Sequence, residues 1–201
     1  ISMYYDPMIA KLCTWAPTRE KAIEQMREAL DGFEVEGIGH NLPFLSAVMD
    51  HPRFIKGDIT TAFIEEEYPE GFVGVELAEE ELMRIAASCA AMNRVAEIRR
   101  TKISGRMDNH ERRVGDDWIV TLQNKKYELK ILADHLGSTV QFKDGAKIRV
   151  EGRWTPGDQL AKMLVDETRL TMKVGKITGG FHIRNRGADL KVLEEAKFNL
   201  N

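Results

Sequence analysis

The chain has 201 residues, of which 43% are hydrophobic and 30% are charged, and its formal net charge is −3. This composition is typical of a globular protein with one or two domains and enough apolar residues for a substantial core. The slightly negative charge gives no global attraction to nucleic acid or anionic lipid, so we expect neither nucleic acid nor a membrane as a partner. The two cysteines, Cys13 and Cys89, form no metal-binding or disulfide pattern, which favours a reducing, intracellular compartment.

Residues 1–72 alternate between strand-like and helix-like patterns. Short apolar or alternating runs predict strands, whereas apolar residues at a spacing of three or four predict helices with one buried face. Thr18 and Asn41 are suitable N-caps for the two longer helices. The predicted elements are a strand at Met8–Trp15, a helix at Arg19–Leu30, a strand at Phe33–Ile38, a helix at Leu42–Met49 and a short helix at Thr60–Tyr68. This order indicates a small α/β subdomain.

The stretch Glu79–Arg100 predicts a long helix, roughly 33 Å at about 1.5 Å per residue. Between Leu82 and Met92 the apolar residues face every direction around the helix axis, and a helix that is apolar all round must be buried all round. A membrane span is the competing interpretation, but a span needs about 20 predominantly apolar residues. Arg84 and the pair Asn93-Arg94 interrupt this run too early. We therefore expect the helix to be enclosed by protein.

From Asp117 onward the hydrophobic period changes from helical to two, which predicts eight short strands. Turn residues between the strands indicate antiparallel pairing, and eight antiparallel strands can close into a barrel without a free edge. The residues expected to face inward are Trp118, Val120 and Leu122; Tyr127, Leu129 and Ile131; Val140 and Phe142; Ile148 and Val150; Leu160, Met163 and Val165; Leu170, Met172 and Val174; Phe181 and Ile183; and Leu190 and Val192. The fold class is therefore α+β, with the long helix filling the barrel.

Three motifs carry a family resemblance. Tyr4–Leu12 (YYDPMIAKL), Asn41-Leu42 and Gly57–Phe63 (GDITTAF) resemble the end of the biotin carboxylase C-terminal subdomain of biotin-dependent acyl-CoA carboxylases. Up to Phe72 the chain is most similar to the α subunits of propionyl-CoA carboxylases. In that family the next segment, the BT domain, is a long helix inside an eight-stranded antiparallel barrel. The resemblance implies a biotin carboxylase part at 1–72 and a BT domain at 73–201, with its central helix at 79–100, a hook loop at 101–116 and the barrel at 117–193.

The resemblance also implies a function. The BT domain would join the rest of the α subunit to the carboxyltransferase β subunit in a hetero-oligomer. The whole enzyme would carboxylate biotin with ATP, Mg²⁺ and bicarbonate and then convert propionyl-CoA to methylmalonyl-CoA. In such proteins biotin is carried on a domain absent from this chain, and the ATP, Mg²⁺ and bicarbonate sites lie mostly upstream. We therefore expect the chain to be inactive alone, and its compartment to be the bacterial cytoplasm or the mitochondrial matrix. A methylcrotonyl-CoA or acetyl-CoA carboxylase is an alternative within the family.

The resemblance points to two groups of site residues. Asp6 resembles a supporting aspartate near the biotin and bicarbonate site, where a carboxylate could orient an arginine; the alternative is a turn aspartate before Pro7. The hook is rich in basic residues without interleaved aromatic residues, so a base-stacking platform is not indicated. Either partner docking or a solvated charged loop accounts for it. The candidate partner-binding residues are Ile103, Ser104, Arg106, Met107, His110, Arg112 and Arg113.

Other chemically suggestive residues have structural interpretations. The five histidines show no zinc-binding spacing, so we predict no metal site. The run Gly175–Gly180 (GKITGG) lacks the P-loop spacing and is expected to be a hairpin turn, and Trp118 and Trp154 are expected to pack in the barrel. A competing function from a different class is a ligand-binding barrel with an appended α/β domain. The two hypotheses differ in whether the helix fills the barrel, because a barrel of eight strands that contains a helix has no room for a ligand.

Overall fold

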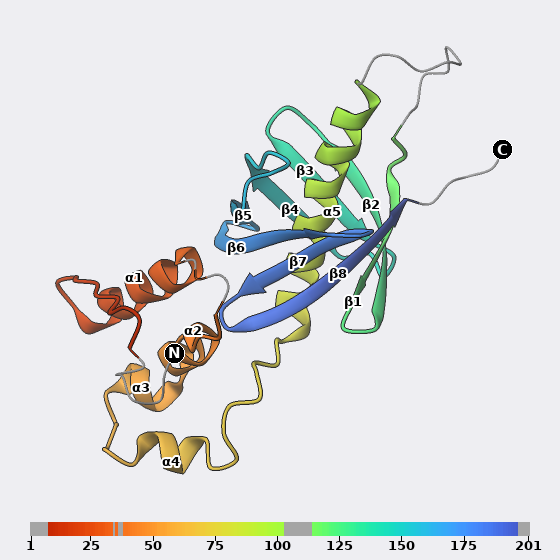
Figure 1. The fold of residues 1–201 in the computed structure, drawn as a ribbon. Coiled ribbons are helices and arrows are strands. Elements are labelled where there is room, and N and C mark those ends of the chain that lie inside the picture. The colour runs from red at the N-terminus through yellow and green to blue at the C-terminus, as the bar shows by residue number, and fades with distance from the viewer. Residues whose placement is uncertain (1–7, 34, 36–37, 103–113, 197–201) are drawn as a thin grey trace. The chain divides into compact units, whose positions relative to one another are not determined.

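The computed structural model describes residues 8–33, 35, 38–102 and 114–196, and the chain divides into two compact units. The first unit comprises Ile1–Val73 and the second Gly74–Asn201. The described part of the first unit is helical, and the second unit contains one long helix and a closed barrel (Figure 1).

The long helix of the second unit, α5, runs from Glu79 to Thr101. It begins with three glutamates, which suit the positive end of the helix dipole, and Arg99 and Arg100 lie near its negative end. The Glu81 carboxylate accepts a hydrogen bond from the Ala78 N–H at 3.0 Å and so satisfies one free donor at the start of the helix. Every residue from Ile85 to Met92 is buried. The prediction of a helix that is buried on all sides is therefore confirmed.

Eight antiparallel strands surround α5 and close into a barrel in simple sequential order (Figure 1). Each strand pairs with the next, and β8 returns to pair with β1, so the sheet has no free edge. The strands are β1 (Asp117–Leu122), β2 (Lys125–Ala133), β3 (Gly137–Phe142), β4 (Lys147–Gly152), β5 (Leu160–Val165), β6 (Thr168–Ile177), β7 (Gly180–Asn185) and β8 (Ala188–Ala196).

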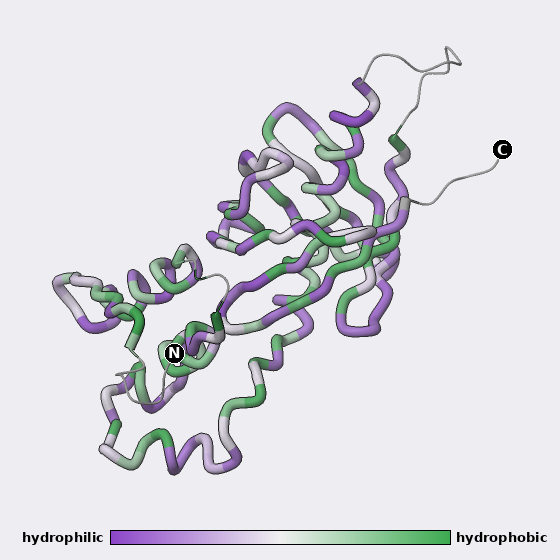
Figure 2. Tube along the Cα trace, in the orientation of Figure 1, coloured by the Kyte–Doolittle hydropathy of each residue, from purple (hydrophilic) through white to green (hydrophobic). Residues whose placement is uncertain are grey.

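The barrel interior is one apolar cluster formed by α5 and the inward side chains of the strands. Along the strands buried and more exposed residues alternate, and Figure 2 shows this as alternating green and purple along the barrel. Three hairpins turn through two consecutive residues with positive φ: Gln123-Asn124, Asp166-Glu167 and Arg186-Gly187. Such turns match the right-handed twist of the paired strands. The sheet is therefore both closed and tightly connected.

Three details of the second unit differ from the prediction. In β5 the residue facing the core is Ala161, which is fully buried, whereas Leu160 is only half-buried. The prediction for Leu160 was wrong because Ala161, Met163 and Val165 share one face of the strand at a period of two. In addition, α5 extends to Thr101, and β8 continues to Ala196, beyond the predicted end of the barrel at Leu193.

The first unit contains four helices among its described residues: α1 (Arg19–Gly32), α2 (Leu42–Asp50), α3 (Pro52–Lys56) and α4 (Phe63–Glu67). Thr18 caps α1 as predicted, since its side chain accepts a hydrogen bond from the Lys21 N–H, but the Asn41 side chain makes no such bond at α2. Between α3 and α4, Arg53 bridges Glu66 at 2.7 Å and Glu67 at 2.6 Å. These contacts hold the short helices together.

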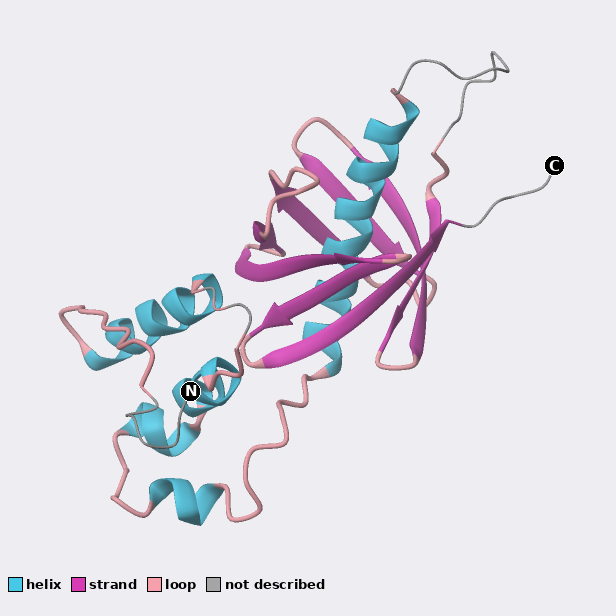
Figure 3. Ribbon diagram, viewed as in Figure 1, coloured by secondary structure: helices cyan, strands magenta, loops and turns pink. Residues whose placement is uncertain are grey.

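The two strands predicted in the first unit are not found among its described residues, and Figure 3 shows helices and loops there. Met8–Trp15 is an extended loop in which Met8, Ile9 and Trp15 are exposed. The described residues of Phe33–Ile38 lie outside any strand, and residues 34, 36 and 37 are outside the described set. A strand requires a paired neighbour for its backbone groups, and neither run pairs with another described segment.

Over the described ranges, no helix combines the length and the apolar character that crossing a membrane requires.

Candidate assembly site at the end of the central helix

The C-terminal turns of α5 lead to the predicted hook segment, and β1 begins where that segment ends. The last described residue before the segment is Lys102, and the first one after it is Val114. All seven predicted partner-binding residues lie in 103–113, outside the described residues, and so does Asp6. The structure therefore describes the two stems from which this segment, hereafter the 103–113 segment, extends.

Both stems are attached to the barrel. On the helix side, the Arg94 guanidinium lies 3.6 Å from the Asp116 carboxylate, which joins α5 to the start of β1. On the strand side, Val114 packs against the core, the Trp118 indole N–H donates to the Gly115 carbonyl at 3.0 Å, and the Ile131 N–H donates to the Asp116 carbonyl at 2.8 Å. The start of β1 is thus tied to the barrel core and, through Asp116, to Arg94 about two turns before the end of α5.

The last turns of α5 carry a mixture of charged and apolar side chains. Glu97 is buried and pairs with Arg100 one turn later, and the Thr101 hydroxyl donates to the Ile98 carbonyl at 2.7 Å. Val95 is 42% exposed and Arg99 is exposed. A mixture of apolar and arginine side chains suits a protein interface better than a catalytic centre.

The other residues that the sequence singled out have structural roles where the structure describes them. The Trp154 ring contacts the Phe181 ring edge-on at 5.5 Å, and its indole N–H donates to the Asp158 carbonyl at 3.0 Å. The run Gly175–Gly180 includes the turn between β6 and β7, as predicted. Among histidines, His51 lies 3.2 Å from the Glu67 carboxylate, and His182 pairs with Asp189. No cluster of His, Cys, Asp or Glu among the described residues could hold a metal ion.

Sequence reasoning missed Glu194, an ionisable residue inside the barrel. It follows Leu190 and Val192 on the inward face of β8 and is only 7% exposed. Burial raises the pKa of its carboxyl group to about 8, and the Asn93 side chain on α5 partly offsets this effect. Burial also raises the pKa of the nearby Cys89 thiol, with a smaller contribution from Glu194. The alternation that placed Leu190 and Val192 inside, continued by two residues, would have found Glu194.

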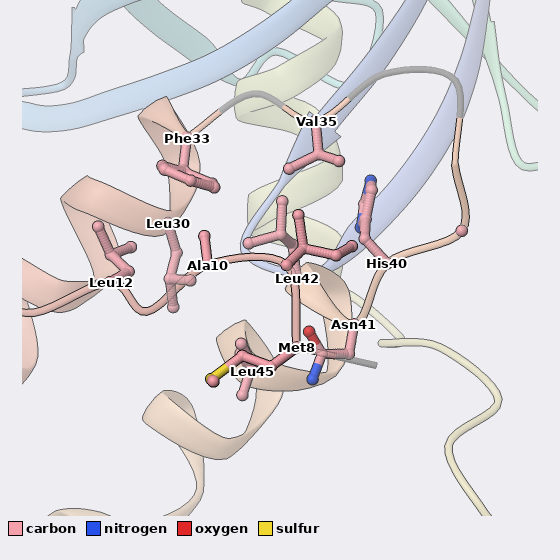
Figure 4. A pocket seen from close by; sticks show the side chains of 12 residues that line it. Met8, Ala10, Leu12, Leu30, Phe33, Val35, His40, Asn41, Leu42 and Leu45 are labelled. Atoms are coloured by element: carbon pink, nitrogen blue, oxygen red, sulfur yellow. The ribbon is translucent and has the colours of Figure 1, made fainter. Parts of the chain in front are cut away.

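The first unit contains an apolar hollow of about 580 Å³ (Figure 4). Its walls come from the loop at Met8–Leu12, the end of α1 at Leu30 and the start of α2 at Leu42 and Leu45. Figure 4 shows these side chains pointing towards one another across the hollow, with His40 and Asn41 at its rim. The two runs that were predicted as strands line this hollow. Its described lining residues include no paired acidic or basic groups of the kind that catalysis would require.

Comparison with known proteins identifies the family. Residues 85–195 match the model of the propionyl-coenzyme A carboxylase BT domain, and residues 1–66 match that of the biotin carboxylase C-terminal domain. The chain belongs to the propionyl-CoA carboxylase BT domain family. The first match contains most of α5 and all eight strands except the end of β8, so the helix-filled barrel is the BT domain.

Individual relatives agree with this assignment. The chain is 73% identical over 192 residues to a propionyl-CoA carboxylase alpha chain of Ruegeria pomeroyi, covering 96% of this chain and 28% of that protein. It is 32% identical over 179 residues to the mitochondrial propionyl-CoA carboxylase alpha chain of Rattus norvegicus, covering 86% of this chain and 24% of that one. A methylcrotonoyl-CoA carboxylase subunit alpha of Dictyostelium discoideum is 47% identical over 64 residues, or 32% of this chain and 9% of that one. The chain thus spans about a quarter of the length of the propionyl-CoA carboxylase relatives.

Proposed function

We propose that the chain is part of the α subunit of a biotin-dependent propionyl-CoA carboxylase and that its BT domain binds the carboxyltransferase β subunit. The whole enzyme would use ATP, Mg²⁺ and bicarbonate to carboxylate biotin and would transfer the carboxyl group to propionyl-CoA. No described residue of this chain is assigned to biotin or nucleotide. The contribution of the chain is therefore assembly.

The observation that carries this proposal is that the 103–113 segment connects α5 and β1, two elements of one closed barrel. The ion pair between Arg94 and Asp116 joins the two elements, and Val114 packs against the core. A segment held in this way loses less conformational entropy on binding than a segment attached at one end, which favours affinity. Its apolar residues Ile103 and Met107 would supply the buried centre of the interface, and its arginines would supply the charged surround.

The competing ligand-binding barrel loses its support, because α5 occupies the barrel interior. Ala86, Ala87 and Ala90 on the helix are fully buried, and their small side chains allow the strands to approach the helix closely. An interior of eight strands that already contains a helix offers no room for a small molecule. The barrel therefore serves as a framework.

Co-purification with the cognate carboxyltransferase β subunit tests the assembly role. The intact chain should retain the β subunit on an affinity column, whereas a variant in which residues 104–113 are replaced by an equally long Gly/Ser segment should not. Val114 is kept because it packs against the core. Lys143→Glu, at a turn where the lysine side chain is 75% exposed, provides a surface control that should still bind.

Two results would contradict the proposal. One is retention of the β subunit by the replacement variant at the level of the intact chain. The other is failure of the intact chain to bind at all. A circular dichroism melt of the replacement variant shows whether its barrel remains folded, so that a loss of binding is attributed to the segment alone.

The hollow of the first unit supports a further element of the proposal, namely that the rest of the α subunit covers it. Met8, Ile9 and Trp15 are exposed apolar residues on or beside the loop that forms one wall. Leaving such side chains in water is unfavourable by about 25 cal/mol per Å² of apolar surface. Fusing the chain to the preceding part of a full-length α subunit should therefore bury Trp15 and shift its fluorescence to shorter wavelength.

The acyl-CoA substrate is proposed from the relatives. The 73% identity to a propionyl-CoA carboxylase alpha chain favours propionyl-CoA, whereas the shorter likeness to a methylcrotonoyl-CoA carboxylase subunit keeps that class as the alternative. Activity of the assembled α and β subunits with each acyl-CoA distinguishes the two. We place the enzyme in the bacterial cytoplasm or the mitochondrial matrix, in line with the bacterial and mitochondrial relatives.

A further inference from the structure

Glu194 occupies a position where a charge is poorly tolerated. Its side chain lies on the inward face of β8, where the two preceding inward residues are Leu190 and Val192. On β1 the residue opposite is Val120, which is fully buried. Among the described residues neither carboxylate oxygen of Glu194 has a hydrogen-bond partner of good geometry, and the neutral amide of Asn93, the one group that favours its ionised form, offsets only part of the effect of burial. A buried carboxylate without a partner is far more costly than a buried carboxylic acid.

The groups around Glu194 do not neutralise its charge. From α5 it faces the amide of Asn93 and the thiol of Cys89, neither of which carries a positive charge. From β1 it faces Val120, and on the other side its backbone N–H donates to the carbonyl of Gly179 at 2.8 Å. The charged residues that follow Asn93 on α5 have other partners: Arg94 pairs with Asp116, and Glu97 pairs with Arg100.

The end of β8 is also held on one side only. β8 pairs with β7 only as far as Leu193, opposite Gly180, and Glu194 makes the last backbone bond on that side. Beyond Glu194 the strand pairs with β1 alone, up to Ala196 opposite Trp118. Local openings with low free energy concentrate at such singly paired strand ends.

We propose that Glu194 makes the closure of the barrel sensitive to pH: with its carboxyl group protonated, β8 closes against β1, and loss of that proton to solvent releases residues 194–196 from the barrel. The released carboxylate gains hydration, and the inside of the barrel at Cys89 gains access to solvent. This inference concerns the barrel itself and does not depend on binding of a β subunit.

The direction of the effect follows from linkage. The pKa of the buried carboxyl group is about 8, compared with 4.5 for an exposed glutamate. Because the closed state binds the proton more tightly, closure is most stable below about pH 4.5 and weakens as the pH rises to about 8. Between about pH 6 and about pH 9 the open fraction should increase roughly 100-fold on these values.

Cys89 is a built-in probe of the opening, because it is fully buried and senses the Glu194 charge. Cys13 is exposed and would react first, so the measurement uses the whole chain with Cys13→Ser. The rate of Cys89 alkylation is compared among this parent protein, its Glu194→Gln variant and its Glu195→Gln variant. Glu195 is the matched control because it is the next residue on β8 and is exposed. The solvent-dependent increase of thiol reactivity with pH is shared by all three proteins. The Glu194 charge raises the pKa of the Cys89 thiol and would slow labelling of the parent protein at high pH, so this contribution opposes the expected effect and cannot imitate it.

The measured quantity is the labelling rate of the parent protein divided by that of Glu194→Gln. This ratio should be roughly 100-fold higher at about pH 9 than at about pH 6. Glu195→Gln should behave like the parent protein. The same ratio at both pH values would overturn the proposal. If Glu194→Gln itself loosens the barrel, Glu194→Met is used instead. Labelling of Glu194→Met at the rate of the parent protein at about pH 9 would also overturn the proposal. Low urea separates local from global opening, since only release of the strand end leaves labelling nearly independent of urea.

Discussion

Ala90→Glu tests whether α5 is enclosed on all sides. Ala90 has 0% exposure, and its neighbours Ala86 and Ala87 on the same helix are equally buried. A glutamate at this position adds Cγ, Cδ and two oxygens to a filled interior, and its carboxyl group has no partner there. The cost of overpacking is about 1–3 kcal/mol, and that of an unpaired polar group about 1–3 kcal/mol even if the carboxyl stays protonated.

Together these terms amount to roughly 2–6 kcal/mol, compared with a stability of about 5–15 kcal/mol for a typical domain. For a unit of this size each kcal/mol lowers the melting temperature by about 3–5 °C, so the melting temperature should fall by roughly 6–30 °C. The assay is a thermal melt followed by circular dichroism in the β-sheet region. Val95→Glu, on the same helix at a residue that is 42% exposed, is the control and should change the stability by about 0.5 kcal/mol at most.

A melting temperature of Ala90→Glu equal to that of the parent protein would refute the reasoning. It would mean that the helix has a hydrated face at Ala90 and that the barrel does not enclose it. A loss that is larger at high pH than at low pH would support the burial argument further, because ionisation of the introduced carboxyl group adds the cost of a buried charge.

Two further predictions concern the barrel wall. Gly180→Ala should destabilise the barrel, since a Cβ at this position would lie 1.9 Å from the Val192 carbonyl oxygen. Gly175→Ala should be tolerated, because the atom nearest to its Cβ would lie at 3.5 Å. Equal melting temperatures of the two variants would contradict the prediction. Asp134 accepts hydrogen bonds from Arg149 and from the Leu136 and Gly137 N–H groups, and these contacts hold the pKa of its carboxyl group well below the usual range. The stability that Asp134 contributes is therefore present above about pH 3.8 and is lost as the pH falls through its lowered pKa. Asp134→Asn should weaken the dependence of the urea unfolding midpoint on pH between about pH 5 and about pH 2. The same dependence in the variant and the parent protein would argue against the prediction.

The barrel could be predicted because its signals are local and repeated. Alternation such as Trp118, Val120 and Leu122 reports which face of a strand is buried wherever that strand lies. Turn residues such as Asn124 and Gly187, both with positive φ, mark the hairpins and so the antiparallel order. A helix without a polar face, followed by strands with one apolar face each, leaves few arrangements that bury both. Where a strand contained a run of apolar residues, as in Leu160–Val165, the period was ambiguous and Leu160 was placed on the wrong face.

The first unit was predicted less well because a strand is defined by its partner. Met8–Trp15 has the composition of a buried strand, but composition cannot supply a neighbour with which its backbone N–H and carbonyl groups can pair. Helix α1 was predicted because its hydrogen bonds are internal and its Thr18 cap is adjacent in sequence.

The amino-acid sequence alone was sufficient for the fold of the BT domain, since its periodicity encodes burial residue by residue. Only the tertiary structure could reveal the ionisable group inside it. Glu194 is an ordinary glutamate in the sequence, and its raised pKa arises because closure of β8 against β1 brings it beside Asn93 and Cys89 on a helix about a hundred residues earlier in the chain. Desolvation depends on all the atoms that surround a group, and those atoms are assembled only when the barrel closes.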